Sequence, residues 1–560
     1  MMKTKNNIKY LVLLLVGITF SCETTELDLL DNPNFLQPDQ FSADLLLNQI
    51  QLDAALFFEQ VTDEGQEVTR MIHGFGPDYF SGYGPGRLNA PYTTLYASII
   101  PDTNTLLSET EAQGLTVHSG IARILQAYTL MTMVDYLGDI PLSETGLGLE
   151  IDNPQVDPDE EVYNQIEELL NDAIVNLSTE SPLVPANDLY YPMSAANPTP
   201  NVENWITFAR TLLLKMNLQT RLVNPNAASN INNLVNAGVI TSSDQDFQLQ
   251  YGTSDLNPDN RHPQFSANYD AGVTDYQSNH YMNVLVNGFN VEDPRTRFYF
   301  YRQSDVSGDD TTQSCINQLA PPQFSEDDAF CVVFSDTTGE GAWWGREHFD
   351  AGNIPPDDGL RTNWGLYPVG GLFDDDSFTI TNSRDQGAQG AGISPIMLSS
   401  FVNFMLAESA LTINTNGDAR DFLEQGMRQS INKVINFAPL SGVSLDILPV
   451  EIGGNLDTIE PYIAEVLAAY DAAGSDSERL EIVIQQYFIA LYGNGVEAYN
   501  TYRRTGFPSN LQPALSANPG VFVRSFLFPA TAVNTNSNIN QKPDQTVPVF
   551  WDTNPEGFVD

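Results

Sequence analysis

The 560-residue sequence predicts a mainly α-helical protein in which pairs of helices form a scaffold that carries long loops. Three observations predict this fold class. Apolar residues recur at three- and four-residue spacing over several long stretches. Short breaks containing Gly or Asn divide these stretches into units of roughly 35–40 residues, the size of tetratricopeptide-type helix pairs. Residues 224–392 are instead rich in Asn, Asp, Gly, Pro and aromatic residues, and long irregular segments are more often functional than idle.

The N-terminus has the pattern of a secretory signal peptide. Lysines at positions 3, 5 and 9 precede an apolar run from Leu11 to Phe20, which is shorter than the roughly 20 residues that span a bilayer. Cys22 ends this region and resembles the lipidated cysteine of a loose bacterial lipobox. We therefore expect residues 1–21 to be removed and residues 22–34 to form a lipidated tether, the only membrane attachment. A plain signal peptide or a core helix is the alternative.

The helical scaffold is predicted from four stretches in chain order. The first, residues 119–144, places one apolar face along a helix that Gly138 and Pro141 end; the face comprises Ile121, Ile124, Leu125, Tyr128, Met131 and Val134. The second helix covers residues 204–223, with Trp205 expected in the core and Leu222 near the same faces. Two helix pairs follow: 394–413 with 418–438, and residues 478–506 with a break at Gly493–Gly495.

Composition and charge limit the function classes. A hydrophobic content of 42% with 10% aromatic residues favours a packed globular body. Removal of residues 1–21 changes the formal net charge from −48 to −51, because three lysines and no acids are lost. Such a charge disfavours nucleic acid and, more weakly, polyanionic ligands. Cys315 and Cys331 then remain, and either a disulfide or two free thiols fits the sequence.

Motifs in sequence order resemble the SusD/RagB family of the Bacteroidetes. They cover nearly the whole mature chain and are "ARILQAYTLMTMVDYLGDIPLSE", "NVENWITFARTLLLKMNLQTRL", "DPRTRFYF", "GREHFD", "IPPDDGLRTNWGLYPVGGLFDDD", "ISPIMLSSFVNFMLAESAL", "GVEAYNTYRRTGFP" and "RSFLFPATAVNTN". The resemblance implies one SusD-like domain over residues 35–560. Its helical scaffold would occupy about 35–223 and 393–508, with the loop-rich insert at 224–392 and a C-terminal loop segment at 509–560.

The resemblance also implies a function. Members of the family are outer-membrane lipoproteins that face the cell exterior, bind nutrients, usually glycans, and break no bonds. They act as a lid on a SusC-type TonB-dependent transporter. The acids that follow Cys22 resemble the surface-export signal of such lipoproteins. We therefore expect a binding protein rather than an enzyme, with a glycan as ligand, the transporter as partner and no cofactor.

Glycan sites use aromatic rings that stack on the C–H faces of sugars, with polar side chains beside them for the hydroxyls. The segment "GEGAWWGREHFD" and an early loop, "YFSGYGPGRLNAPYTTLY", have this composition. The resemblance implies ligand contacts from the early loop and the middle loops. Tyr92 and Tyr96 are expected to pack in a short helix. The predicted ligand-binding residues are Trp343, Trp344, Trp364, Tyr79, Tyr83, Arg87, Asn89 and Arg346.

Other chemistry is weakly indicated. Among 72 acidic residues any catalytic carboxylate pair would be arbitrary, and the five histidines show no metal-ligand spacing. No G-x-S-x-G elbow or phosphate-binding loop occurs. Asp374, Asp375 and Asp376 are weak calcium candidates. Arg503 and Arg504 are expected to tie neighbouring loops through carboxylates rather than contact ligand.

The expected ligand is a neutral polysaccharide such as a β-glucan, because the chain is strongly acidic. A local cluster of Arg87, Arg297, Arg302 and Arg346 would favour an anionic glycan instead. Two other functions stay open. One is a surface glycoside hydrolase, and the other is a transporter lid that is mainly structural or serves a non-glycan nutrient such as peptides.

Overall fold

The computed structural model describes residues 42–146, 151–194, 197–304, 315, 318–333, 343–350, 360–437 and 458–559. Cys22 and its tether lie outside the described residues. Residues Asp44–Asp560 form one compact unit, apart from a short N-terminal unit that ends at Ala43. Within the described residues, no helix has both the length and the apolar character needed to cross a membrane.

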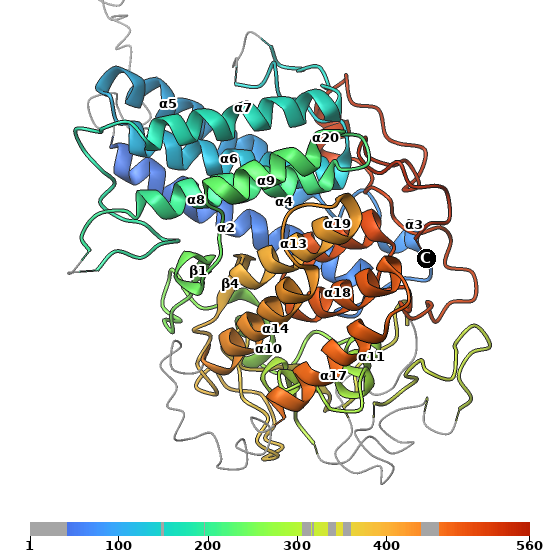
Figure 1. Cartoon of the computed structure of the whole chain (residues 1–560). Helices are drawn as coiled ribbons and strands as arrows, with labels where there is room; N and C mark the ends of the chain where they lie inside the picture. Colours follow the sequence, from blue (N-terminus) through green and yellow to red (C-terminus); the bar gives the residue numbers. More distant parts are fainter. Residues whose placement is uncertain are drawn as a thin grey trace, which may run out of the picture. The chain divides into compact units, whose positions relative to one another are not determined.

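The first half of the large unit is a layer of helices that pack against their neighbours in sequence (Figure 1). α5 contacts α6, α6 contacts α7, α7 contacts α8 and α8 contacts α9. These elements are α2 (Ala43–Val68), α3 (Tyr79–Gly82), α4 (Asn89–Thr94), the π-helical turn η2 (Leu95–Ile99), α5 (Ile100–Gln113), α6 (Thr116–Leu137), α7 (Asp159–Leu177), α8 (Val202–Gln219) and α9 (Ala227–Ala237).

Two predicted helices of this layer are present with differences. α6 ends at Gly138, whose φ of +76° suits glycine, as predicted. It buries nearly every residue rather than one face, because α5, α7 and α8 all contact it. α8 stops at Gln219, and Leu222 is 48% exposed rather than part of the helix face. Trp205 is fully buried, as predicted.

The middle of the chain contains short elements joined by loops. They are η4 (Ser243–Gln245), β1 (Phe247–Gln250), α10 (Pro263–Tyr269), α11 (Asn279–Asn287), α12 (Thr296–Tyr299), β2 (Phe300–Arg302), β3 (Thr362–Trp364) and β4 (Ile393–Met397). β1 pairs with β4 and β2 with β3, both antiparallel. The predicted helix 394–413 is therefore wrong at its start: Pro395 disfavours a helical residue before it, and this buried segment pairs with β1.

The second half contains the predicted helix pairs, α13 (Ser399–Ile413) with α14 (Ala419–Ile435) and α18 (Asp476–Ala490) with α19 (Gly495–Thr505). α17 (Ile459–Ala472), a helix that the sequence analysis did not predict, precedes α18, and the short α20 (Ala530–Thr535) follows α19. α13 contacts both α14 and α18, and α17 contacts α18 (Figure 1). The breaks fall where the sequence places them, at Asn414 in the left-handed conformation and at Gly493.

α19 is buried along its whole length although it carries charged residues. Arg504 donates to both oxygens of Glu408 on α13, at 2.7 Å each. Burial alone would raise the pKa of Glu408, but Arg504 and Arg221 lower it below its ordinary value. Glu497 pairs with the buried Lys215 of α8 at 2.6 Å. The predicted carboxylate tie is thus confirmed for Arg504.

Arg503 departs from that prediction because it binds backbone carbonyls. Its two terminal nitrogens donate to the carbonyl oxygens of Arg524 and Asp135, at 2.6 Å each. The guanidinium also lies over the rings of Tyr499 and Trp551, at 3.8 and 4.7 Å from the ring centres. Arg503 therefore joins the end of α6 to the C-terminal loop segment.

α2 and α19 cross with their backbones in contact. A Cβ built on Gly65 of α2 would lie 2.1 Å from the carbonyl oxygen of Gly495, and one on Gly495 would lie 1.9 Å from that of Thr62. The Thr62 hydroxyl also accepts from the Gly495 N–H at 2.7 Å. Only glycine fits at either position, and this crossing joins the first helix to the last helix pair.

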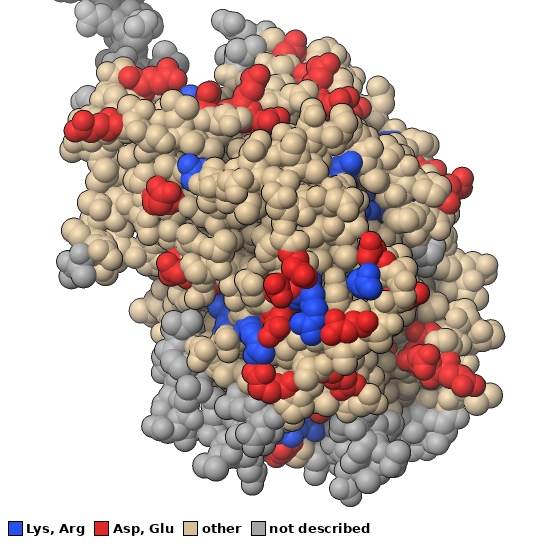
Figure 2. All heavy atoms as spheres, in the orientation of Figure 1, with Lys and Arg blue, Asp and Glu red and all other residues tan. Residues whose placement is uncertain are grey.

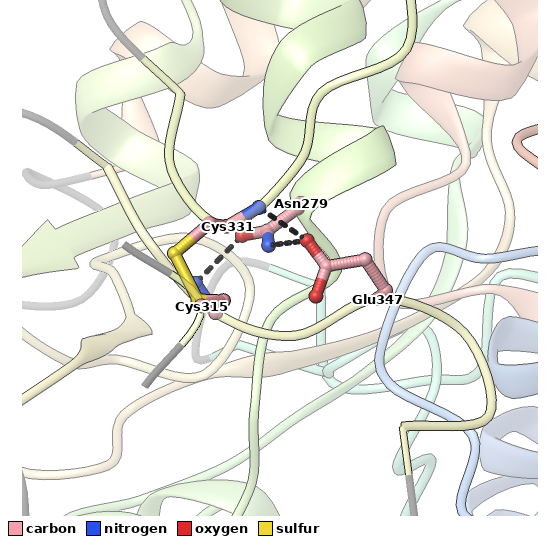
Figure 3. The surroundings of a disulfide bond; sticks show 5 residues. Asn279, Cys315, Cys331 and Glu347 are labelled. Carbon is pink, nitrogen blue, oxygen red and sulfur yellow. Dashed lines mark hydrogen bonds between the residues drawn. A yellow bond between two sulfur atoms is a disulfide. The ribbon is translucent and has the colours of Figure 1, made fainter. Parts of the chain in front are cut away.

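A disulfide joins Cys315 to Cys331, which settles the alternative that the sequence left open. Beside it, the buried carboxylate of Glu347 accepts from the Cys331 N–H and from the Asn279 side chain, at 2.6 Å each (Figure 3). Burial raises the pKa of Glu347. The disulfide loop is thereby anchored to the start of α11.

Four buried or partly buried acidic residues lie within α2, and their pKa values are raised. Burial raises the pKa of Glu59 to about 7 and raises the pKa values of Asp63, Glu64 and Glu67 as well. Arg87 offsets part of this effect through ion pairs with Glu64 and Glu67. A carboxyl with a raised folded-state pKa stabilises the fold at low pH and loses that contribution as pH rises.

We predict that Gly65→Ala lowers the melting temperature. Alanine normally stabilises a helix interior by about 1 kcal/mol relative to glycine, but here the added methyl must separate α2 from α19, a strain of about 1–3 kcal/mol or more. Gly86→Ala is the matched control, since a Cβ there meets no atom within 4 Å. A melting temperature for Gly65→Ala equal to or above that of Gly86→Ala would contradict the crossing.

We predict that Glu59→Gln weakens the dependence of stability on pH. In the wild type, the unfolded chain loses this proton near pH 4.5 and the folded chain near pH 7, so stability should fall across that interval, by up to about 3 kcal/mol. Thermal melting at about pH 5 and about pH 8 measures the difference between the two proteins. Parallel pH profiles would show that Glu59 titrates normally.

Candidate functional site

The predicted aromatic platform of the middle segment is buried. Trp343 is 2% exposed, with the Arg302 guanidinium 4.3 Å from its ring centre, and its backbone pairs with Val333. Trp344 is 6% exposed and exchanges hydrogen bonds with Thr362. A ring enclosed by protein cannot stack on a sugar, so these tryptophans are corrected to core residues. Both face inward because their segment lies among loops from several parts of the insert.

Trp364 is also a core residue rather than a platform. It is 1% exposed at the end of β3, and its ring lies 4.8 Å from that of Tyr492. Its backbone carbonyl accepts from the Tyr269 hydroxyl at 2.6 Å. The β2–β3 pairing places the residue between α10 and the end of α18, which explains the burial.

Tyr79 and Tyr83 of the early loop are buried together. Their rings stack at 6.3 Å between centres and contact His348 and Phe349. The Phe349 N–H donates to the Gly74 carbonyl. The structure therefore brings together the two segments that the sequence singled out, but as a packed core. Both tyrosines are corrected from ligand contacts to core residues.

The predicted polar donors are occupied by protein partners. Arg87 pairs with Glu64 and Glu67, and the Asn89 side-chain oxygen accepts from the N–H and hydroxyl of Thr531. Arg346 is 5% exposed and donates to the Tyr276 hydroxyl at 2.9 Å. These residues position the early loop and the insert.

Two phenylalanines in and just before the early loop reach the surface. Phe75 is 50% exposed and Phe80 is 58% exposed. Phe75 lies against His73, with ring centres 4.3 Å apart, and 5.8 Å from the Arg346 guanidinium. These two phenylalanines therefore face solvent, while Tyr79 and Tyr83 stay inside.

The weak calcium candidates pair with arginines. Asp374 accepts from the backbone and guanidinium of Arg302, and Asp376 pairs with Arg297 and Arg302. Asp375 accepts from a backbone N–H. No group of three or more metal-ligating side chains converges within the described part of the chain. Of the arginines named as a possible anion cluster, Arg87, Arg297 and Arg302 thus pair with acids.

An open concavity near α4 combines aromatic rings with polar side chains. Its volume is about 670 Å³, and its walls come from α4, η2, α5, the loops on either side of residues 147–150, and the end of α20. The lining residues are Tyr92, Tyr96, Pro101, Asn104, Thr105, Ser108, Glu144, Thr145, Gly146, Ile151, Asp152, Pro154, Thr535 and Asn536.

Tyr92 and Tyr96 form the aromatic wall. Both are partly exposed, and their ring centres lie 4.3 Å apart with 33° between the planes. The Tyr96 hydroxyl donates to the Pro141 carbonyl at 2.7 Å, which fixes that ring. Tyr96 belongs to the π-helical turn η2, a type of helix irregularity often found at functional sites. The wider turn joins α4 to α5 while both rings stay on the concave side.

The polar lining suits hydroxyl groups and disfavours anions. Asn104 and Asn536 supply amides, Glu144 and Asp152 supply carboxylates, and the threonines and Ser108 supply hydroxyls. None of the described residues that line the concavity is Lys or Arg. Rings that stack on C–H faces beside groups that bond hydroxyls are the elements of a sugar site.

Sequence reasoning missed this site because it expected Tyr92 and Tyr96 to pack. Their i, i+4 spacing fits one helix face, which is the signal of a buried stripe as well as of an exposed one. Only the neighbouring elements decide which is true: the loop after α6 holds the Tyr96 hydroxyl through Pro141, and both rings stay partly exposed in the concavity.

Two family models match the chain. Residues 43–318 match the SusD-like model described as "Starch-binding associating with outer membrane", and residues 380–546 match "Susd and RagB outer membrane lipoprotein". A search of curated proteins found no match. The two family models are therefore the sequence comparisons that relate this chain to known proteins.

Solved structures share the fold. A SusD/RagB family protein from Bacteroides thetaiotaomicron is 18% identical with a TM-score of 0.63, over 92% of this chain and 100% of its own. A chitin-binding SusD homologue from Flavobacterium johnsoniae is 18% identical with a TM-score of 0.58, over 91% and 99%. At this identity the likeness shows the fold alone. Together with the two family models, it shows that the chain belongs to the SusD/RagB family of outer-membrane lipoproteins.

Proposed function

We propose that the protein captures a neutral glycan at the cell surface and delivers it to a SusC-type TonB-dependent transporter. In this proposal the ligand binds in the concavity beside Tyr92 and Tyr96. The single observation that carries the assignment is the pair of partly exposed tyrosine rings among amides, carboxylates and hydroxyls. Two comparisons support it: one family description names starch binding, and a SusD homologue of similar fold is chitin-binding.

The preference for a neutral glycan rests on charge. Glu144 and Asp152 line the concavity without a Lys or Arg among its described lining residues. Acidic side chains also outnumber basic ones on the face shown in Figure 2. A sulfated or uronate glycan would be repelled both at a distance and in the site. A neutral sugar escapes this repulsion and can bond to the carboxylates through its hydroxyls.

The proposed lipid anchor and the proposed transporter partner are supported by the outer-membrane lipoprotein family to which the chain belongs. Cys22 would hold the protein at the outer membrane, with the acidic tether leading to α2. Binding there would be of micromolar to millimolar affinity, on the order of −4 to −8 kcal/mol, which permits release to the transporter. A binding protein of this kind forms no new reducing ends when incubated with its glycan, whereas a glycoside hydrolase would.

We predict that Tyr92→Ala weakens binding of a neutral glycan about tenfold, roughly 1.4 kcal/mol, because it removes one stacking face. Calorimetric titration of the unlipidated mature chain against β-glucan, α-glucan, mannan, xylan, chitin oligosaccharides and alginate measures this. Phe75→Ala is the matched control, an exposed ring that does not line the concavity. Loss of binding in Phe75→Ala alone would move the site from the concavity to the surface around Phe75. No binding across the panel would favour a peptide or structural lid.

We predict that Trp343→Ala destabilises the protein by about 3–5 kcal/mol, as for other buried aromatics. Tyr92→Ala should change the melting temperature little, because its ring is partly exposed. Thermal melting of the two variants separates a core residue from a ligand contact. If Trp343→Ala melts like the wild type but fails to bind glycan, then Trp343 is a ligand contact after all.

A further inference from the structure

A second concavity of about 510 Å³, which we call the amide concavity, lies between the start of α8, the loop before it and the segment that leads from η4 into β1. It shares no lining residue with the concavity beside Tyr92 and Tyr96. Figure 1 shows α8 and β1 toward the left of the view. The two concavities are therefore separate places on the protein.

Hydrogen bonds within the protein fix the walls of the amide concavity. The Asn204 side chain donates to the Asp244 carbonyl at 3.0 Å, which ties the first turn of α8 to η4. The Tyr191 hydroxyl donates to the Gln245 carbonyl at 3.1 Å, which ties the loop before α8 to the same segment. The walls are thus held without a ligand, as is usual for sites that bind small molecules.

Asn204 presents an unpartnered acceptor to this concavity. The residue is 8% exposed, and its backbone and side-chain N–H groups donate to Asn201 and Asp244. Its Oδ1 accepts no hydrogen bond from the described residues, yet it is not among the fully enclosed unpartnered atoms. Since Asn204 lines the concavity, this oxygen opens into it. A ligand must bring an N–H or O–H donor to bond it.

Donors and apolar surface lie in the same concavity. The side-chain N–H groups of Asn201 and Gln248 have no acceptor among the described residues. Met193 and Pro200 supply apolar surface. One acceptor, amide donors and apolar surface together match the three parts of an acetamido group, which are its N–H, its carbonyl oxygen and its methyl.

Other ligand chemistry fits this lining less well. Tyr190 and Tyr191 are only 2% and 7% exposed, so neither offers a ring face for stacking on a sugar. None of the described lining residues is Lys or Arg, which disfavours an anionic group. The buried Asp246 carboxylate already accepts from the Lys433 ammonium and the Ser399 N–H, at 2.7 Å each, so it is not available to an ammonium group.

We propose that the amide concavity is a second ligand site, which binds the acetamido group of an N-acetylated amino sugar. The acetamide N–H donates to Asn204, its carbonyl oxygen accepts from the amide of Gln248 or Asn201, and its methyl packs against Met193. A hydroxyl at the same carbon supplies neither the carbonyl nor the methyl. A peptide also carries amides, but the exposed Thr199 and other polar side chains of the rim suit sugar hydroxyls better than apolar side chains.

The ligands that test this proposal can be matched closely. Three β-1,4-linked tetrasaccharides differ only at C2: the N-acetylglucosamine tetramer with acetamide, cellotetraose with hydroxyl, and the glucosamine tetramer with ammonium. Acetylated and amidated trialanine carries the same amide on a peptide. Calorimetric titration of the unlipidated mature chain measures their affinities. We expect the acetamido tetramer to bind at least tenfold more tightly than each of the other three.

Variants assign this preference to the amide concavity. Asn204→Ala/Gln248→Ala should reduce the preference for the acetamido tetramer over cellotetraose to less than threefold. Gln425→Ala/Asn432→Ala is the matched control, because it removes the same two side-chain amides from exposed positions on α14, and it should keep the tenfold preference.

A single variant keeps the test decisive if the double variant does not fold. Gln248→Ala removes an enclosed oxygen that has no hydrogen-bond partner among the described residues, so we expect a melting temperature close to that of the wild type. It should lower the preference for the acetamido tetramer at least threefold.

Four results would overturn the proposal. A preference below threefold in the wild type, or no binding of the acetamido tetramer, would show that the acetamide is not recognised. Equal or tighter binding of the peptide or of the ammonium tetramer would assign the site to another ligand. Equal loss in the control variant would show an effect outside the concavity. Loss of the preference in Tyr92→Ala, with retention in Asn204→Ala/Gln248→Ala, would place the acetamide beside Tyr92.

Failure of this proposal is distinguishable from failure of the proposed function. Binding of cellotetraose that is weakened by Tyr92→Ala and kept in Asn204→Ala/Gln248→Ala would support the site beside Tyr92, whatever the result for the acetamido tetramer. A preference that depends on Asn204 and Gln248 would support the amide concavity even if no other neutral glycan binds.

Discussion

The backbone contact between α2 and α19 is the constraint on which the rest of the structure depends. Gly65 and Gly495 allow the two helices to touch, which brings the first helix of the unit against the last helix pair. α19 is then enclosed, and its charges must find partners inside the protein. A buried ion pair left with one partner costs about 3–5 kcal/mol. Glu408 of α13 and Lys215 of α8 supply those partners. The position of α19 therefore fixes where these two side chains lie.

That enclosed centre explains why the aromatic segments of the insert lie inside. The early loop and the segment around Trp343 close over the ends of the helices, and their tyrosine, histidine and phenylalanine rings fill the space between them. Arg87 and Arg346 fix these loops through an acid and an aromatic partner. In the proposed function, the ligand binds instead in the concavity near α4, at the edge of the first helical layer.

The concavity near α4 offers two tyrosine rings for stacking, and none of its described lining residues is Lys or Arg. This lining agrees with a chain whose acids outnumber its bases threefold, 72 against 24. In the proposed function, such an acidic surface repels anionic polymers at a distance and leaves neutral sugars free to approach.

The sequence by itself determined the helix pairs, their glycine and asparagine breaks, the buried role of Trp205 and the tie between Arg504 and a carboxylate. These features follow from local periodicity and backbone conformation, which neighbouring residues encode. It could not determine which aromatic residues face ligand. Trp343 and Tyr92 each sit in segments of suitable composition, and their exposure depends on elements far away in the chain: Arg302 covers Trp343, while Tyr92 lines a concavity that α20 also borders. Only tertiary packing decides this, because burial is a property of the neighbours that folding brings together.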